Sequence, residues 1–407
     1  MRVIYNIGIY LLKSICFLLS FFNRKIKAML YGQKETFYKI NQIKEQDNIA
    51  WFHCASLGEF EQARNLIEEF KEKYPNYKIL LSFFSPSGYE VRKNYSHADY
   101  VVYLPWDTKK NARTFIKLAR PKIVFFVKYE FWYNYIIELK NIPLFQVSLI
   151  LQENHYLTKF YSFWFRKQLG NFNAFFVQDT KSKEILETLG YKNSEICGDT
   201  RFDRVLQISK QKKDFPLIDA FCFGEEKIFI AGSSWPEDER VIDEVFENKP
   251  NFKLIIVPHE IDKPHLNNLQ KLFTNSLLYS KANEENVKDK KVLIIDCMGI
   301  LSYIYSKADI TYVGGGFGVG IHNILEAAVF YKPVAFGPNN KKFREARELL
   351  ALSGAKEIHN AKELSDWVEN LLRDERYYQQ SCYQCGNYVK SNAGATQKIL
   401  DKVKTYL

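Results

Sequence analysis

The sequence predicts an α/β protein with two doubly wound parallel-sheet domains. Short apolar runs alternate with segments of helical periodicity from residue 49 onward. The alternation stops at a polar, lysine-rich stretch, residues 207–214, and then begins again. A chain of 407 residues is also long enough for two domains of ordinary size. Because strands separated by helices form parallel sheets, we expect ligands in a cleft where the strands of the two domains end.

The first half contains six predicted strands separated by helices. The strands are expected at residues 49–54, 78–84, 100–103, 123–127, 144–148 and 174–177. The helices are expected at residues 59–73, 88–95, 108–119, 130–139, 159–169 and 181–189.

The second half repeats this pattern. Its strands are predicted at residues 228–231, 254–257, 292–295, 310–313 and 333–336, with helical segments between them. The predicted organisation is an N-terminal segment, a first domain, a linker, a second domain and a C-terminal helix, at residues 1–30, 31–206, 207–224, 225–386 and 387–407.

Composition narrows the classes of partner. A net charge of +10 is compatible with nucleic acid, an anionic membrane surface or phosphorylated substrates. No basic run lies in the context of a DNA- or RNA-binding motif, so nucleic acid is not expected. Seven scattered cysteines, an odd number, indicate a reducing compartment. Cys382 and Cys385 form one CxxC without a second pair, so no zinc site is predicted.

The N-terminus is predicted to be a membrane anchor. Residues 4–22 are mostly apolar and are followed by Arg24, Lys25 and Lys27. No small-residue cleavage site follows them, which argues against a removed signal peptide. The length is marginal for a spanning helix, and the basic residues favour a cytoplasmic body. The segment is expected to span the bilayer or to lie in its interface; a buried amphipathic helix is the alternative.

A glycine-rich turn, residues 313–326 (VGGGFGVGIHNILE), follows a predicted strand and leads into a helix expected at residues 323–330. Five glycines within residues 314–320 permit sharp turns and close approach of a ligand, as at Gly315 and Gly316. Peptide N–H groups at such a turn form an anion site. The spacing differs from the dinucleotide fingerprint, so a phosphate other than that of NAD is predicted. The alternative is a tight turn without a ligand.

Glu59 is the candidate general base. It follows the strand at residues 49–54 and the turn at Gly58, and it lies at the start of a helix. A carboxylate at this position points into the predicted cleft and can accept a proton from a hydroxyl. On spacing alone, a capping box between Ser56 and Glu59 is the first interpretation.

Other strands are followed by small, polar or charged residues. Ser85 and Glu130 follow strands of the first half, and Ser233 and His259 follow strands of the second. Each alone is more typical of a turn than of a site. The run Phe160–Phe165 is aromatic and is expected either to contact acyl chains or membrane, or to pack in the core.

The order of these segments resembles the bacterial 3-deoxy-D-manno-octulosonic acid (Kdo) transferases of lipid A synthesis. The matching segments run from about Trp51 to Ala355, and SLGE and HNILEAA are the most specific. They are SLGE (56–59), SPSG (85–88), YLPWD (103–107), ARPKIVFFVKYEFW (119–132), LG (189–190), GDTRFD (198–203), AGSSWPEDE (231–239), IIVPHE (255–260), DCMGIL (296–301) and VGGGFGVGIHNILEAA (313–328).

The resemblance implies a GT-B glycosyltransferase of two Rossmann-like domains facing a cleft. It implies an acceptor-binding first domain, a CMP-sugar-binding second domain and a C-terminal helix that crosses back. The implied reaction is inverting transfer of Kdo from CMP-Kdo to a lipid A precursor at the cytoplasmic face of the inner membrane. No metal or other cofactor is implied.

The resemblance and the strand ends together give the candidate site residues. Glu59 occupies the position of the family's catalytic base. The acceptor-side residues are Ser56, Gly58, Ser85 and Glu130. The donor-side residues are Ser233, Pro258, His259, Met298, Gly299, Ile300, Gly315, Gly316, Asn323, Ile324, Leu325 and Glu326.

The chain departs from the family pattern at several positions. Lys128 and Glu130 stand where many members have two acidic residues, and His259 replaces a usual arginine. Ile300 replaces a usual glutamate, and Gln152 stands near a common arginine. An active transferase is predicted because Glu59 and the HNILEAA segment remain. The alternatives are a GT-B enzyme using another nucleotide sugar and a catalytically silent membrane-associated scaffold.

Overall fold

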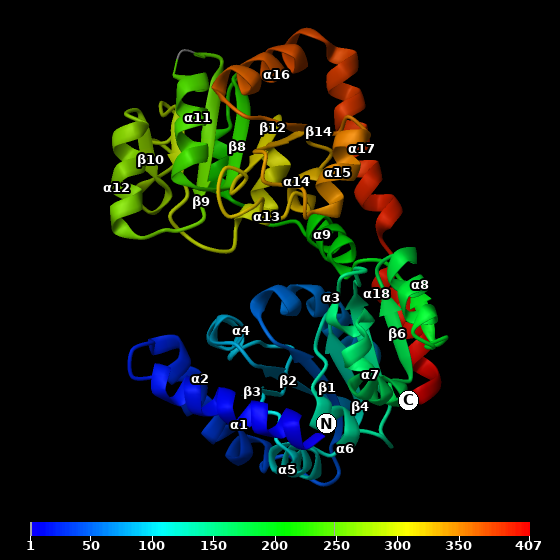
Figure 1. Ribbon diagram of the computed structural model, residues 1–407. Coiled ribbons are helices and arrows are strands. Elements are labelled where there is room, and N and C mark those ends of the chain that lie inside the picture. The colour runs from blue at the N-terminus through cyan, green and yellow to red at the C-terminus, as the bar shows by residue number, and fades with distance from the viewer. Residues whose placement is uncertain (1, 248) are drawn as a thin grey trace. The chain divides into compact units, whose positions relative to one another are not determined.

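The computed structural model describes residues 2–247 and 249–407, which form two compact units (Figure 1). The first unit contains residues 2–204 and 393–407, and the second contains the described residues of Val205–Asn392. The segment predicted as a linker, residues 207–224, contains the end of helix α9 (Thr200–Lys210) and all of α10 (Pro216–Phe221).

The first unit has a seven-stranded parallel sheet in the order β3-β2-β1-β4-β5-β6-β7. Chain order reverses between β1 and β4, as in doubly wound folds. The strands are β1 Asn48–Cys54, β2 Tyr77–Phe83, β3 Tyr100–Tyr103, β4 Pro121–Val127, β5 Leu144–Leu149, β6 Ala174–Val177 and β7 Ser194–Ile196. The α-helices are α1 Arg2–Leu19, α2 Arg24–Ile40, α3 Leu57–Lys73, α4 Pro86–Arg92, α5 Lys109–Ala119, α6 Tyr133–Glu138, α7 Phe163–Arg166, α8 Thr180–Thr188 and α18 Ala395–Val403, with the start of α9.

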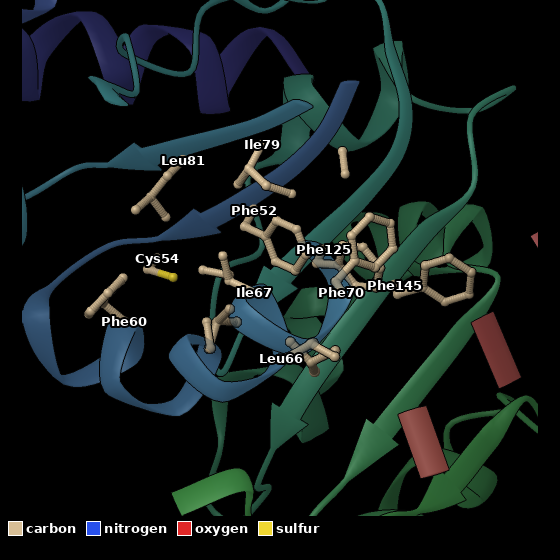
Figure 2. Packing of buried hydrophobic residues seen from close by; sticks show 14 of the residues in the cluster. Phe52, Cys54, Phe60, Leu66, Ile67, Phe70, Ile79, Leu81, Phe125 and Phe145 are labelled. Carbon is tan, nitrogen blue, oxygen red and sulfur yellow. The ribbon is translucent and has the colours of Figure 1, made fainter. Parts of the chain in front are cut away.

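The core of the first unit is aromatic. The central strands β1 and β4 are almost continuously apolar because helices cover both faces of the sheet. Phe52 stacks on Phe125 with ring centroids 4.5 Å apart, and Phe70 of α3 packs edge-on against both rings. Figure 2 shows the labelled side chains of α3 facing those of β1, β2 and β4. This packing fixes the start of α3 at the end of β1.

The second unit repeats the architecture with the strand order β10-β11-β9-β8-β12-β13-β14, all parallel. The order reverses between β8 and β12. The strands are β8 Lys227–Ser234, β9 Phe252–Pro258, β10 Ser276–Leu278, β11 Val292–Ile294, β12 Ile310–Val313, β13 Val334–Phe336 and β14 Ala355–Glu357. After α10, the α-helices are α11 Pro236–Phe246, α12 Lys263–Leu272, α13 Leu301–Ile304, α14 Leu325–Ala328, α15 Arg344–Ala351, α16 Ala361–Arg373 and α17 Glu375–Asn392.

The predicted fold class is therefore confirmed, and all eleven predicted strands are present within a few residues. The sequence prediction missed β7, β10 and β14, which have three residues each and contribute little apolar periodicity.

Three predicted helices were wrong in extent. Residues 159–169 form short 3₁₀ turns and the single turn α7, because the Ser162 hydroxyl donates to backbone carbonyls instead of supporting a continuous helix. The helix predicted at residues 130–139 begins at Tyr133, where the distant Asp107 accepts from the N–H groups of Asn134 and Tyr135.

The helix predicted at residues 323–330 is limited to α14, Leu325–Ala328. The chain reverses at Tyr331, which has a left-handed φ of 58°, and Pro333 follows. The residue before a proline disfavours the helical conformation, so the helix cannot continue through Lys332.

Helix α1 is the one described helix long and apolar enough to cross a membrane, judged by length and composition alone. None of its residues is buried. It packs beside α2, and Tyr5 donates a 2.6 Å hydrogen bond to Asp107. Residues 393–407 belong to the first unit, where Asp203 accepts from the N–H groups of Gly394 and Thr396 at the start of α18.

Candidate functional site

The acceptor-side candidates gather at the carboxyl ends of β1, β2 and β4. Ala55, after β1, accepts backbone hydrogen bonds from Phe84 (3.2 Å) and Ser85 (2.7 Å), which follow β2. The loops that carry Ser56 and Ser85 therefore lie side by side. These strands flank the reversal point of the sheet, where doubly wound folds bind ligands.

Glu59 is held by the first turn of α3. Its Oε2 accepts from the Ser56 backbone N–H at 2.6 Å and from the Ser56 hydroxyl, which forms a capping box. The capping interpretation is thus correct, and it occupies only one carboxylate oxygen. Among the residues that the structure describes, no hydrogen bond engages Oε1 of Glu59, which is half-buried. A capped carboxylate with one open oxygen can still accept a proton.

Gly58 is not required by the backbone. It lies inside α3 without a positive φ, and a Cβ there would meet only the Ser56 hydroxyl at 3.8 Å. The tight turn expected at this position is made by the extended Ser56 instead.

Glu130 is buried, with 8% of its surface exposed, and two side chains lie within hydrogen-bond distance of its carboxylate. His53 Nε2 lies 3.1 Å from Glu130 Oε2, and the Trp132 indole N–H donates to the same oxygen at 2.6 Å. Lys128 has a left-handed φ of 62°, which turns the chain sharply between β4 and Glu130. A buried carboxylate needs such donors, because its charge is costly away from water.

His53 continues this network into the sheet. The fully buried imidazole has Nδ1 at 2.9 Å from the Ser82 hydroxyl, which accepts from the Trp51 indole at 2.8 Å. The Ser82 carbonyl oxygen lies 3.1 Å from the same Nδ1, and the Trp132 indole N–H lies 3.0 Å from Nε2, so both ring nitrogens have partners. Four residues from β1, β2 and the loop after β4 thereby orient one carboxylate.

The donor-side candidates gather at the ends of β8, β9 and β12 in the second unit. The His259 N–H donates to the Ser234 carbonyl at 3.0 Å, which joins the segment after β9 to the end of β8. Asp238, fully buried at the start of α11, accepts from the N–H groups of Trp235 (2.9 Å) and Gly315 (2.8 Å) and from the Tyr312 hydroxyl (2.6 Å). Burial raises the pKa of Asp238, and these three donors oppose the rise.

The glycines of the turn are required by backbone packing. Gly315 has a φ of 91°, and a Cβ there would lie 2.3 Å from the Gly320 carbonyl oxygen. A Cβ on Gly316 would lie 2.5 Å from the backbone nitrogen of Gly337, after β13. By contrast, a Cβ on Gly318 would meet no atom within 4 Å. Close approach of chain to chain therefore requires glycine at both positions, and approach of a ligand there stays a prediction.

Three rings stack beside the turn. Trp235 stacks on His259 and His259 on His322, with centroids 5.1 and 4.3 Å apart. The Trp235 indole N–H donates to His322 Nε2 at 3.1 Å. Burial, reinforced by the charge of His259, lowers the pKa of His322 to about 4. His322 is therefore neutral near pH 7 and acts as an acceptor.

The remaining donor-side candidates differ in what they can offer a ligand. Asn323 and Glu326 are half-buried, and the Asn323 amide donates to Glu326 Oε1 at 3.1 Å. The side chains of Ile324 and Leu325 are fully buried, so only their backbone can face a ligand.

The other five donor-side candidates lie at or near strand ends. Ser233 has a left-handed φ of 52°, Pro258 is buried at the end of β9, and Met298 is 75% exposed beside Gly299 and Ile300. Within residues 2–247 and 249–407, no group of three or more His, Cys, Asp or Glu side chains could hold a metal ion.

Four residues of these sites were missed by sequence reasoning: His53, Trp132, Trp235 and Asp238. His53 is a polar residue inside an apolar strand, which was a usable signal because buried polar groups need partners. Asp238 follows Trp235-Pro236 at a predicted helix start, which is typical of a cap. That it also binds the distant glycine turn is not visible in the sequence.

Comparison with known proteins shows similarity to Kdo transferases. A family model described as 3-deoxy-D-manno-octulosonic-acid transferase (kdotransferase) matches residues 31–204. This match ends at Arg204, where the chain passes from the first unit into the second. The 3-deoxy-D-manno-octulosonic acid transferase of Chlamydia muridarum is 26% identical, with 91% of this chain and 90% of the relative covered. The enzyme of that name from Aquifex aeolicus is 28% identical, with 84% and 92% covered.

Residues 31–204 thus match the Kdo transferase family model, and the chain is similar to Kdo transferases over most of its length. A bifunctional glycosyltransferase/methyltransferase of Fusobacterium nucleatum is 29% identical over 87% of this chain, which spans 57% of that relative's length. Among solved structures, UDP-GlcNAc 2-epimerase from Neisseria meningitidis has a TM-score of 0.61 at 15% identity, with 88% of this chain and all of that chain covered. HepE of Anabaena has a TM-score of 0.53 at 11% identity, with the same coverage. These likenesses show a GT-B-like fold of two Rossmann-like units.

Proposed function

We propose that this protein moves Kdo from CMP-Kdo to a hydroxyl of a lipid A precursor in lipopolysaccharide synthesis. The match of residues 31–204 to the Kdo transferase family model and the similarity to curated Kdo transferases support Kdo transfer. The observation that carries the proposed chemistry is the Glu59 carboxylate, whose Oε2 is fixed by Ser56 while Oε1 stays open. It lies at a strand end of the first unit, within the segment that the family model matches.

In the proposed reaction, Glu59 Oε1 takes the proton of the acceptor hydroxyl while that oxygen attacks the anomeric carbon of Kdo. The bond from this carbon to the phosphate oxygen of CMP breaks on the opposite face, so the configuration inverts. Ser56 keeps the carboxylate aimed because two donors hold its other oxygen. Glu130, fixed by His53 and Trp132, is the second acceptor-side carboxylate and binds a sugar hydroxyl in this scheme.

The glycine turn is the proposed site of the CMP phosphate. The N–H groups of Gly316, Phe317 and Val319 find no acceptor among the described residues, and Gly316 is buried. A buried N–H without an acceptor requires a ligand or a water molecule, and several such groups in one turn form an anion site. Since α14 has only four residues, the turn rather than a helix dipole supplies the donors. The proposed transfer uses no metal or other cofactor.

The proposal also places the protein at the inner membrane, with both units on the cytoplasmic side where CMP-Kdo is available. The apolar helix α1 and the basic residues that follow it support this placement.

The test is transfer from CMP-Kdo to a tetraacylated lipid A precursor, measured by mass spectrometry. Wild type is expected to add one or more Kdo masses. Glu59→Gln keeps a capping side chain but removes the base, so it should lose about 10²–10⁴-fold in rate while its melting temperature is nearly unchanged. Glu61→Gln, on the same helix and paired with Arg92, is the matched control and should retain its rate.

A well-folded wild type that transfers no Kdo, but transfers sugar from a UDP-sugar, would replace the proposed donor. A wild type inactive with both donor classes would support the silent scaffold. Equal losses in Glu59→Gln and Glu61→Gln would remove Glu59 from the role of base.

A further inference from the structure

We propose that the first unit binds one acyl chain of an acidic membrane phospholipid in a cavity between α1, α2 and the segment after β3. The proposal rests on three observations at one place: an apolar cavity, three lysines around it and a buried hydrogen-bond donor without a partner. It does not depend on which sugar the enzyme transfers.

The cavity has a volume of about 670 Å³, within the range of small-molecule sites. Phe17 of α1 and Phe21 just after it form one wall, with ring centroids 5.5 Å apart. Leu30 and Phe37 of α2 and the buried Trp106 form the others. An apolar cavity of this size, open beside an exposed apolar helix, suits a hydrocarbon chain because burial of each methylene is favourable.

Lys13, Lys27 and Lys34 line the same cavity. In the described part of the chain, none of the three forms an ion pair, whereas several other lysines of the first unit do. Lysines can keep their stems on apolar surface and hold their charge outward. An apolar cavity surrounded by three uncompensated positive charges therefore fits a ligand with a hydrocarbon tail and an anionic headgroup.

Trp106 provides a separate observation. Its side chain is 3% exposed, and its indole nitrogen is buried without a hydrogen-bond partner within residues 2–247 and 249–407. Such donors are uncommon because an unmade hydrogen bond is costly. Because Trp106 also lines the cavity, an acyl chain bound there lies against this residue.

The placement of α1 brings the cavity to a membrane surface. The start of the helix is fixed to the unit by polar contacts: Tyr5 donates to Asp107, and the Asn134 amide donates to Asn6 at 2.9 Å. Its outer face exposes large apolar side chains over nearly the full helix length, among them Ile4, Leu11 and Leu18. A helix fixed along the unit with an apolar outer face is typical of one lying in the interface.

The apolar surface continues past the start of α1. Tyr5 contacts Trp164, and Phe160 and Phe163 beside it are 88% and 72% exposed. Within the run Phe160–Phe165, Phe160 and Phe163 are exposed and available for contact with a membrane, whereas Phe165 packs in the core. A bilayer that covers this surface presents acyl chains and acidic headgroups directly to the cavity.

The experiment measures quenching of tryptophan fluorescence in the full-length protein by vesicles of phosphatidylglycerol brominated on one acyl chain. Bromine quenches a tryptophan only at short range, so the difference between wild type and Trp106→Phe reports contact at Trp106. We expect wild type to be quenched more strongly than Trp106→Phe. Brominated phosphatidylcholine vesicles at the same lipid concentration should give less of this difference.

Matched pairs separate the cavity from general membrane attachment. Phe17→Ser/Phe21→Ser should abolish the quenching assigned to Trp106. Leu18→Ser/Phe22→Ser, which removes two exposed apolar residues of the same segment outside the cavity, should preserve it. Thermal unfolding of each variant verifies that the protein is folded.

The charge of the ligand is tested with lysine variants. Lys13→Gln/Lys27→Gln/Lys34→Gln should raise the phosphatidylglycerol concentration needed for half-maximal quenching by about 100-fold, since each lysine near an acidic surface contributes roughly a factor of five. The control changes three exposed lysines of the same unit, Lys122, Lys192 and Lys398, to Gln and should shift it far less. The proposal is overturned if Trp106→Phe is quenched like wild type, if both pairs of α1 variants behave alike, or if phosphatidylcholine quenches equally.

Discussion

The two candidate sites lie at equivalent places in two similar sheets, but side chains fix the first and the backbone mainly fixes the second. In the first unit, the carboxylates after β1 and β4 are fixed by side chains: Ser56 holds Glu59, and His53 with Trp132 holds Glu130. In the second unit, the turn after β12 is fixed mainly by the chain itself, with Gly315 and Gly316 packed against neighbouring backbone.

This difference follows from the chemistry proposed for each site. A base must have a defined orientation, and donors on one carboxylate oxygen provide it. A phosphate is bound by several N–H groups, and a closely packed turn keeps these groups in fixed directions. In the first unit, we therefore expect transfer activity to be most sensitive to substitutions of the orienting side chains. In the second unit, we expect it to be most sensitive to substitutions that add a Cβ at a packed glycine.

The largest effect is expected for Gly316→Ala. Its Cβ would lie 2.5 Å from the Gly337 nitrogen, a contact that only backbone displacement can relieve. The second unit should lose about 3 kcal/mol of stability, and CMP binding should fall with it. Thermal unfolding and calorimetric titration with CMP measure the two effects.

Gly318→Ala is the matched control, two residues away in the same turn. Its Cβ meets no atom within 4 Å and its φ is not positive, so both stability and CMP affinity should stay near wild type. Equal damage by the two substitutions would show that flexibility of the turn, rather than close packing, requires the glycines.

In the first unit, His53→Ala is expected to cost about 2 kcal/mol because it leaves the buried Glu130 with one fewer donor. Transfer activity should fall as Glu130 loses its orientation. His53→Gln, which can still donate, should recover part of both. Urea unfolding and the mass-spectrometric transfer assay check this, with the exposed His97→Ala as control. If the stability of His53→Ala falls as expected but its transfer activity does not, Glu130 has no part in the reaction.

A smaller effect is expected from the titration of His322. Its pKa falls from the ordinary value of 6.5 to about 4 in the folded protein, chiefly through burial. Between these values the unfolded chain binds a proton that the folded one does not, so stability is lost as pH falls from 6.5 to 4. Protonation at Nε2 would also break the bond from Trp235.

His322→Gln should flatten this part of the pH dependence, because glutamine does not titrate. The check is the urea midpoint of each protein at several pH values in this window. The exposed His97, which forms no ion pair within the described residues, provides the control, since His97→Gln should leave the slope of wild type intact. Parallel curves for wild type and His322→Gln would contradict the depressed pKa.

The sequence predicted the strands and the strand-end loops well, because apolar runs and small polar residues are local signals. It could not predict what depends on distant partners. Asp107 decides where α6 begins, and Asp238 ties α11 to the glycine turn 77 residues away. Ligand approach at the glycines of the turn stays a prediction, whereas the packing of Gly316 against Gly337 is visible only in the fold.

The smallest effect is expected for Gly58→Ala, and its sign sharpens the comparison between the two sites. Gly58 lies within helix α3, where a Cβ meets only the Ser56 hydroxyl at 3.8 Å. Alanine there should stabilise the protein by about 0.5–1 kcal/mol, since glycine is the poorer helix former. If transfer also remains at the wild-type rate, the glycine is dispensable. If the protein is more stable but transfer falls, the acceptor sugar approaches the chain at Gly58. The first unit would then need a glycine to admit its ligand, whereas the second unit needs glycines for the packing of its own backbone.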